Sequence, residues 1–251
     1  MPMTIKGPSS PVVIEVRPLR QQDFCAFGTV IENPDPALTP SEQLQPLPPD
    51  AVQANQGSAL KYANITEMLN LYESGPDKAV SKAVMSMFVC APRELRRSQD
   101  ERQTGLFPVE ILERHPFTTQ TFIPLGLSSD EQDKGRYLVV VAPSSRPSDL
   151  DQPLPVPTSS PSGGKLPGRG LPDLSRMRAF VANGSQAVTY GAGTWHAPMV
   201  ALGKTPVAFV VIQFANGVGI EDCQEVMFPP KDGEGIQVAV PVVSRHGGTK
   251  L

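Results

Sequence analysis

Residues 113–120 read ERHPFTTQ, and residues 190–196 read YGAGTWH. Each stretch places one histidine, His115 or His196, among β-prone residues, and the whole sequence contains only three histidines. A single histidine near an aromatic residue is more often a hydrogen-bonded core residue than a ligand or a catalyst. Two such histidines nevertheless predict a paired site, because side chains of neighbouring strands converge inside a β-barrel.

The strand that carries His115 orients its neighbours by alternation. Successive side chains of a strand point to opposite faces, so Glu113 and His115 should share one face and Arg114 the other. The next strand is expected to run back beside the first, with Gln120 and Phe122 facing the same interior. Arg114 is then expected to be structural or to lie at a dimer interface.

Glu113, His115, Gln120 and His196 together offer nitrogen and oxygen donors. Such a set suits a divalent metal from the middle of the transition series, so these four residues are the predicted metal ligands. Two histidines and a carboxylate in a partly dry pocket also supply acid–base groups near neutral pH without any metal. The sequence leaves both possibilities open.

The rest of the chain predicts one mostly β domain over residues 1–251. Expected strands cover residues 12–16, 29–32, 83–90, 107–115, 118–124, 136–142, 178–182, 187–190 and 206–214. Short helical segments are expected at residues 23–27 and 64–71. Several short strands joined by glycine-containing turns favour an antiparallel barrel or sandwich.

Polar and proline-rich stretches separate the strands. Residues 33–50 are an expected loop, and the charged residues 93–102 are expected to be solvated. Residues 143–172 are rich in Ser, Pro and Gly, which predicts a flexible insertion unable to bury enough apolar surface to fold. Residues 1–11 and 244–251 are expected to be disordered tails.

Composition argues against several kinds of partner. A net charge of −3 offers no basic field for nucleic acid, and no apolar run approaches the ~18 residues of a membrane-spanning helix. Three widely spaced cysteines predict reduced thiols, and residues 1–11 lack a signal-peptide pattern, so we expect a cytoplasmic protein. The terminal Thr249-Lys250-Leu251 is faintly similar to a peroxisomal signal, which leaves peroxisomal import open.

The spacing Glu-x-His-x4-Gln-x5-Gly, from Glu113 to Gly126, resembles the first cupin motif. Glu113 stands at the position of that motif's first histidine, and Gln120 stands at the position of its acid. Residues 191–196, GAGTWH, keep the glycine and the histidine of the second motif but not its proline. The resemblance implies a cupin-like antiparallel β-barrel, also called a double-stranded β-helix.

Five segments together resemble a narrower family, the ureidoglycolate lyases. They are LERHP at 112–116, TQTFIPL at 119–125, RAF at 178–180, NGSQAVTY at 183–190 and GTWHAP at 193–198. The match runs from about Val16 to about Cys223, without the Ser/Pro-rich insertion. It implies a homodimer that splits (S)-ureidoglycolate into glyoxylate and urea in allantoin catabolism. Bacterial members are nickel-dependent, so the expected cofactor is nickel, another divalent metal or none.

Two segments depart from the bacterial pattern of that family. Residues 55–62, NQGSALKY, replace a bacterial His-Ile-Asn-Asn-Gly pattern and are similar to the fungal form, so no ligand is transferred there. Gln213-Phe214 stands where bacterial sequences end a late strand with Asp-Arg, which removes an arginine that would bind a carboxylate.

The substrate of this family indicates roles for the remaining residues. His115 or His196 is expected to act on the hydroxyl as base or metal ligand, with Glu113 and Gln120 orienting or co-ligating. Lys61 is the candidate for the substrate carboxylate, although most lysines are solvated.

Other polar and aromatic side chains are expected to bind substrate. Asn55 and Gln56 form a turn before Lys61 that lets the backbone approach closely. Tyr190 is a donor to the carboxylate or the ureido oxygen, or else a packing residue, and Trp195 is expected to wall the pocket.

Two other functions are compatible with the sequence. One is a non-catalytic cupin that binds a small organic acid, and the other is an amidohydrolase that releases ammonia from ureidoglycolate. The fold alone does not choose among them, because one fold carries many reactions.

Overall fold

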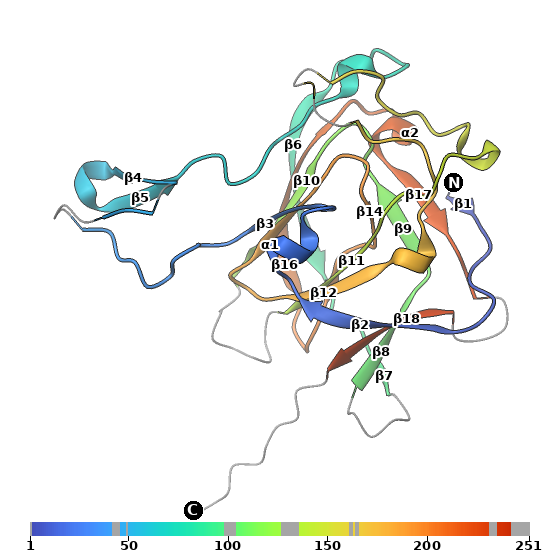
Figure 1. Ribbon diagram of the computed structural model, residues 1–251, viewed down its shortest axis with the longest axis horizontal. Helices are drawn as coiled ribbons and strands as arrows, with labels where there is room; N and C mark the ends of the chain where they lie inside the picture. The colour runs from blue at the N-terminus through green and yellow to red at the C-terminus, as the bar shows by residue number, and fades with distance from the viewer. Residues whose placement is uncertain are drawn as a thin grey trace, which may run out of the picture.

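The computed structural model describes residues 2–41, 46–48, 50–97, 104–126, 136–160, 163, 166–230 and 235–241. Within these ranges the chain forms two β-sheets that pack face to face and one separate hairpin (Figure 1). The antiparallel, mostly β, cupin-like fold expected from the sequence is therefore confirmed. None of the described helices is long and apolar enough to cross a membrane.

The larger sheet contains eleven strands among the described residues. In order they are β1 (Met3–Thr4), β17 (Gln224–Met227), β9 (Ile111–Arg114), β14 (Trp195–His196), β11 (Tyr137–Ala142), β12 (Arg178–Ala182), β2 (Val12–Pro18), β18 (Ile236–Pro241), β8 (Thr104–Val109) and β7 (Arg96–Arg97), with β15 (Val200–Ala201) also paired to β11.

The smaller sheet contains five described strands. In order they are β3 (Gly28–Ile31), β13 (Ala187–Tyr190), β10 (Gln120–Leu125), β16 (Val207–Ala215) and β6 (Lys82–Cys90). The hairpin consists of β4 (Ala51–Ala54) and β5 (Ala59–Tyr62), joined by a 3₁₀ turn at Asn55–Gly57. The described helices are short: α1 (Gln21–Phe24), α2 (Gly219–Asp222) and 3₁₀ turns at Tyr72–Ser74, Asp149–Asp151 and Leu174–Arg176.

Strand β11 is the centre of the core because both of its faces are buried. Tyr137, Val139 and Val141 pack against the smaller sheet in an inner apolar cluster, together with Phe122 and Phe209. Alternate residues of β11 belong to an outer cluster on the other side of the larger sheet. A strand buried on both faces needs a continuous apolar run, and YLVVVA at residues 137–142 supplies it.

Two expectations about the chain near His115 are wrong. Residues 107–115 do not form one strand, because the alternation of buried residues changes parity at Glu110 and separates β8 from β9. Strand β10 does not run back beside β9: it pairs with β13 and β16, whereas β9 pairs with β14 and β17. Residues 115–119 therefore cross from one sheet to the other.

A neighbouring segment explains this crossing. Residues 64–71 form no helix, contrary to expectation, because their backbone pairs with the crossing residues. Leu71 N donates to Phe117 O at 2.8 Å, and Leu69 N donates to Thr119 Oγ1 at 3.0 Å. These tertiary hydrogen bonds override the local helix signal and hold the corner between the sheets.

The Ser/Pro-rich segment also differs from its expected character. Leu154 and Leu171 are buried in the outer cluster, and Asp151 is fully buried. Gly170 O accepts a hydrogen bond from Trp195 Nε1 at 3.1 Å. The described part of residues 143–172 thus buries some apolar surface, whereas the expectation was that the segment cannot bury enough to fold, and its flexibility stays a prediction.

The expected tails and charged loop contain some regular structure. Residues 3–4 of the N-terminal segment form β1, which pairs in parallel with β17. Arg96–Arg97 of the charged stretch form β7, and residues 98–102 lie outside the described part of the chain. The C-terminal segment 244–251 also lies outside it.

Candidate active site

Glu113, His115 and His196 lie together on the face of the larger sheet that looks toward the smaller one. His196 on β14 is in register with Glu113 on β9 and with Val141 of the inner cluster. One donor atom from each of the three side chains lies within 4.8 Å of the others. The alternation of β9 and the position of its neighbour β14 thus confirm the predicted convergence of two histidines and an acid.

His115 presents a bare nitrogen to this cluster. Its Nδ1 lies 2.6 Å from the backbone oxygen of Asp222, and because a carbonyl only accepts, Nδ1 carries the proton. Nε2 is buried and has no hydrogen-bond partner among the described residues. Burial, and then the nearby His196, lower the pKa of His115 to about 4, so the ring is neutral at pH 7.

His196 is oriented in the same way. Its Nδ1 lies 2.9 Å from Thr194 O, again a pure acceptor, so the proton is on Nδ1 in the neutral ring. Nε2 lies 3.1 Å from Gln120 Oε1 and 3.5 Å from Glu113 Oε1, both of them acceptors, so the ring donates to them only when both of its nitrogens carry a proton. Tyr190 stacks on the imidazole at 3.9 Å between ring centroids, with an interplanar angle of 11°. Stacking and the backbone hydrogen bond together fix the plane of the ring.

Glu113 is the most solvent-accessible member of the cluster, with a side chain 21% exposed. Burial raises its pKa, but the hydrogen bond and charge of His196, followed by His115 and Cys223, bring the pKa below its ordinary value. Cys223 Sγ lies 3.9 Å from Glu113 Oε2. Burial and the Glu113 carboxylate raise the pKa of this thiol to about 12, so Cys223 acts as a donor to an ionised Glu113.

Gln120 reaches the cluster from the smaller sheet. Its Oε1 faces His196 Nε2, and its Nε2 donates to Gln213 Oε1 at 2.6 Å. Phe122 follows two residues later on the same face of β10 and packs edge-to-face on Tyr190. The predicted inward orientation of Gln120 and Phe122 is confirmed, although β10 belongs to a different sheet from β9.

Tyr190 carries a second unpartnered polar atom. The residue is 2% exposed, and its hydroxyl has no hydrogen-bond partner among the described residues. Burial, and then the nearby Tyr137 and Glu113, raise its pKa well above the ordinary value, so the hydroxyl keeps its proton. A buried hydroxyl without a partner costs free energy, and a bound ligand oxygen would satisfy it.

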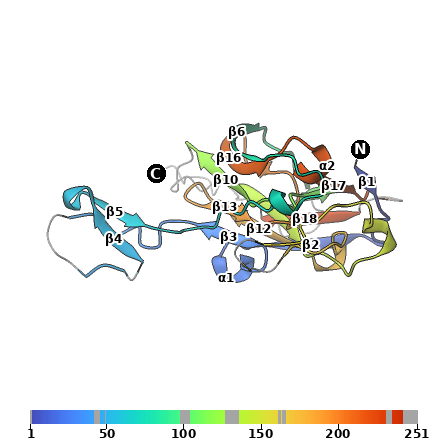
Figure 2. The same ribbon diagram turned by 90° about the horizontal axis from the view of Figure 1, so that it is seen from above.

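Three predicted substrate-binding residues lie elsewhere. Asn55, Gln56 and Lys61 are exposed residues of the β4–β5 hairpin, which extends clear of the two sheets (Figures 1 and 2). Asn55 and Gln56 have φ values of 50° and 54°, so the turn is tight, as its sequence suggested. The structure does not bring these three residues to the histidine cluster of the same chain.

Arg114 and Trp195 point away from the cluster. Arg114 is fully buried, donates from Nε to Gln224 Oε1 at 2.8 Å and lies 4.6 Å from the centre of the Trp195 ring. Trp195 belongs to the outer apolar cluster. The structural role expected for Arg114 agrees with this position, whereas Trp195 supports the sheet from behind and does not wall the cluster.

Four contacts of the site were missed from the sequence: Gln213, Cys223 and the backbone oxygens of Asp222 and Thr194. Gln213 had one available signal, because it is the only strongly polar residue in the run VAFVVIQFA of β16. The backbone oxygens carry no sequence signal, since their positions depend on the path of the chain.

The donor atoms of the cluster fit a divalent metal ion. With both rings neutral and protonated on Nδ1, the Nε2 atoms of the two histidines, one carboxylate oxygen and the amide oxygen of Gln120 all present lone pairs to the same space. A cation among these lone pairs would give the unpartnered Nε2 of His115 a partner.

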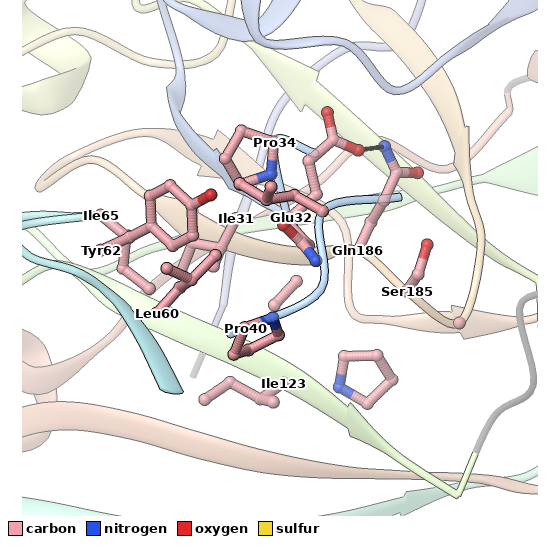
Figure 3. Close-up of a pocket in the computed structure, with 15 residues that line it drawn as sticks. Ile31, Glu32, Pro34, Pro40, Leu60, Tyr62, Ile65, Ile123, Ser185 and Gln186 are labelled. Carbon is pink, nitrogen blue, oxygen red and sulfur yellow. Dashed lines mark hydrogen bonds between the residues drawn. The ribbon is translucent and has the colours of Figure 1, made fainter. Parts of the chain in front are cut away.

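The groove on the opposite face of the smaller sheet is distinct from this cluster (Figure 3). It has a volume of about 530 Å³ and lies between the sheet and the base of the hairpin, with Ile123, Gln186, Leu60 and Tyr62 among its lining residues. None of the residues that line it belongs to the histidine cluster.

Known proteins with similar sequences identify the family of this chain. The sequence model of the ureidoglycolate lyase family matches residues 11–233. A ureidoglycolate lyase from Schizosaccharomyces pombe is 36% identical over 84% of this chain and 89% of its own length. One from Saccharomyces cerevisiae is 36% identical over 77% and 80%, and one from Burkholderia mallei is 27% identical over 83% and 87%. The chain therefore belongs to the ureidoglycolate lyase family.

Proposed function

We propose that this protein cleaves (S)-ureidoglycolate to glyoxylate and urea, as a step in the breakdown of allantoin. The observation that carries the proposal is the convergence of the Nε2 atoms of two histidines, each protonated on Nδ1 in the neutral ring, with the carboxylate of Glu113. The fungal and bacterial relatives named ureidoglycolate lyase support the choice of substrate and reaction.

The reaction needs groups that accept and return one proton. Ureidoglycolate carries a hydroxyl and a ureido nitrogen on one carbon. Loss of the hydroxyl proton lets the oxygen form the carbonyl of glyoxylate while the carbon–nitrogen bond breaks, and the departing nitrogen takes up a proton to give urea. Without a metal, Nε2 of His115, Nε2 of His196 and the carboxylate of Glu113 are the acceptors within reach of one small molecule. With both imidazoles on a metal, the second carboxylate oxygen of Glu113 is the acceptor that remains.

Neighbouring groups orient the substrate for this transfer. The Tyr190 hydroxyl is buried, protonated and without a hydrogen-bond partner in the described part of the chain, so it donates to the carboxylate or the ureido oxygen. Gln120 borders the same space and holds the substrate beside His196. Phe122 and Tyr190 form an apolar wall that excludes water from the breaking bond.

A divalent metal ion is part of the proposal, with nickel as the expected element. His115, His196 and Glu113 would hold it, with Gln120 as a further oxygen donor. A metal held there would supply a Lewis acid toward the hydroxyl of the substrate. Removal of metal by exhaustive chelation should abolish turnover, and full activity in protein shown by elemental analysis to be metal-free would contradict this part.

We further propose a homodimer formed through the outer face of the smaller sheet. Met85, Met87 and Val89 of the edge strand β6 are well exposed, and in the register they continue into Ile212, Val210 and Ala208 of β16. Large exposed apolar faces mark interaction surfaces, and an apolar edge strand invites pairing. In such a dimer the protruding hairpin could contact the other subunit. Lys61 would then bind the substrate in the histidine cluster of that other subunit.

The cytoplasm is the proposed location. Cys25, Cys90 and Cys223 are free thiols in the structure, which supports a reducing compartment.

One incubation tests the central proposal. Purified protein is mixed with racemic ureidoglycolate, and glyoxylate, urea and ammonia are quantified together. Equal amounts of glyoxylate and urea without ammonia are expected. Release of ammonia would establish the amidohydrolase reaction instead, and binding without any product would establish a non-catalytic binding protein.

A further inference from the structure

Gln213 lies behind Gln120 as seen from the histidines, and its side chain contacts Gln120. Thr121 of β10 is in register with Ile212 of β16, so the next cross-strand neighbours are Gln120 and Gln213. Both side chains point inward, because Phe122 and Val211 on the same faces belong to the inner cluster. Their amides meet at 2.6 Å.

The orientation of the Gln120 amide decides what it offers to the site. A glutamine amide carries a carbonyl oxygen at one end and an NH₂ group at the other, so it can present either an acceptor or a donor to His196. Gln213 Oε1 accepts from Gln120 Nε2, which directs Gln120 Oε1 toward His196 Nε2 and the cluster.

We propose that Gln213 is a positioning residue that keeps the oxygen of Gln120 directed at the metal site, as a fourth donor beside two imidazoles and one carboxylate. The proposal rests on the proposed metal site. With the opposite amide orientation, an NH₂ group would point at the same space and repel a cation. Residues that orient metal ligands in this way typically contribute 10-fold to 100-fold to metal affinity.

Two substitutions separate this role from simple packing. Gln213→Glu has similar size and offers only acceptors, so it keeps Gln120 Nε2 engaged and its oxygen in the site. Gln213→Met has similar size but no comparable acceptor, so the Gln120 amide is released. Affinity for Ni²⁺ is measured by calorimetry on the full chain, and the coordination is followed by the visible absorption spectrum of the Co²⁺-loaded protein.

The expected result is a clear order of affinity. Gln213→Met should bind Ni²⁺ about 10-fold to 100-fold more weakly and give an altered Co²⁺ spectrum, whereas Gln213→Glu should bind at least as tightly as the wild type. Thermal unfolding checks that both variants are folded. If Gln213→Met does not fold, Gln213→Glu decides the question. Weaker binding of Ni²⁺ by Gln213→Glu than by the wild type would overturn the proposal.

Two failures can be told apart. If the wild type binds both metals and Gln213→Met binds them within twofold and with an unchanged spectrum, the role of Gln213 is wrong and the metal site stands. If the wild type binds neither metal, the metal site itself is wrong, and the role of Gln213 falls with it.

Discussion

At the scale of single residues, the Nδ1 atoms of both histidines of the cluster are held by backbone oxygens. His115 depends on the carbonyl of Asp222 and His196 on that of Thr194. In the neutral ring, each hydrogen bond places the proton on Nδ1, so that Nε2 keeps its lone pair. Because a backbone oxygen cannot be removed by ordinary substitution, the chemistry of the site is best tested at the rings themselves.

Replacing either ring should therefore stop proton transfer. His115→Ala and His196→Ala are each expected to lower kcat for glyoxylate formation by ~10² or more. The measurement is the rate at saturating ureidoglycolate, with circular dichroism to show that the variant is folded. Near-normal turnover of a folded variant would remove that histidine from the mechanism.

Burial of His115 also makes stability depend on pH. Its pKa falls from 6.5 to about 4 on folding, so below pH 6.5 the unfolded chain takes up a proton that the folded one does not. The free energy of unfolding of metal-free protein should therefore decrease as pH falls, by ~2 kcal/mol from this group between pH 7 and pH 5. His115→Gln should lose that share of the decrease, as measured by urea unfolding at both pH values. An identical pH dependence in the two proteins would show that His115 is not buried as a neutral ring.

The sequence predicted most of these residues, for definable reasons. Alternation of side chains along one strand depends only on local sequence, so the sequence alone predicts that Glu113 and His115 share a face. The spacing of the cupin motifs located His196 and Gln120. Lys61 was placed wrongly relative to the cluster of its own chain, because the path of a hairpin that packs on no neighbouring strand leaves no periodic signal.

At the scale of elements, the strands were predictable and their partners were not. Apolar runs fixed β11, β12 and β13 to within one residue. The break between β8 and β9, and the crossing of residues 115–119, follow from pairing with segments that are distant in sequence. Residues 64–71 were misassigned for the same reason. Composition alone also could not show that residues 143–172 cover the outer cluster.

The packing of that segment can be measured by a matched pair of substitutions. Leu154 is 6% exposed and Leu150, four residues earlier, is 65% exposed. Leu154→Ala should lower the free energy of unfolding by ~2–5 kcal/mol, whereas Leu150→Ala should change it by less than ~0.5 kcal/mol. Equal small effects in urea unfolding would mean that the segment does not pack on the sheet in solution.

At the scale of the whole molecule, the described surface is uneven in character. Leu154 and Leu171 of the Ser/Pro-rich segment pack in the outer cluster of the larger sheet, whereas the outer face of the smaller sheet leaves methionine and valine side chains exposed. The exposed hairpin extends away from both sheets (Figure 2). A second copy of the chain would bury the uncovered face.

A charge placed on that face should prevent association. Met87 is 62% exposed on β6, and Val13, on β2 of the other sheet, is 53% exposed. Met87→Lys is expected to shift the mass measured by light scattering from dimer to monomer, because burying an unpaired ammonium is costly. Val13→Lys should leave the dimer intact. A monomeric wild type, or a dimer unaffected by Met87→Lys, would contradict the proposed interface.

The placement of Trp195 gives the protein a built-in optical reporter. It is the only tryptophan of the chain, and it directly precedes a histidine of the cluster. The Arg114 guanidinium lies over the face of its indole, and its Nε1 donates a hydrogen bond to Gly170 O. Its fluorescence will therefore register detachment of the covering segment as a shift to longer wavelength, without any label. The fluorescence of Trp195 thus reports on the outer side of the larger sheet, behind the histidine cluster, while substrate is turned over on the inner side.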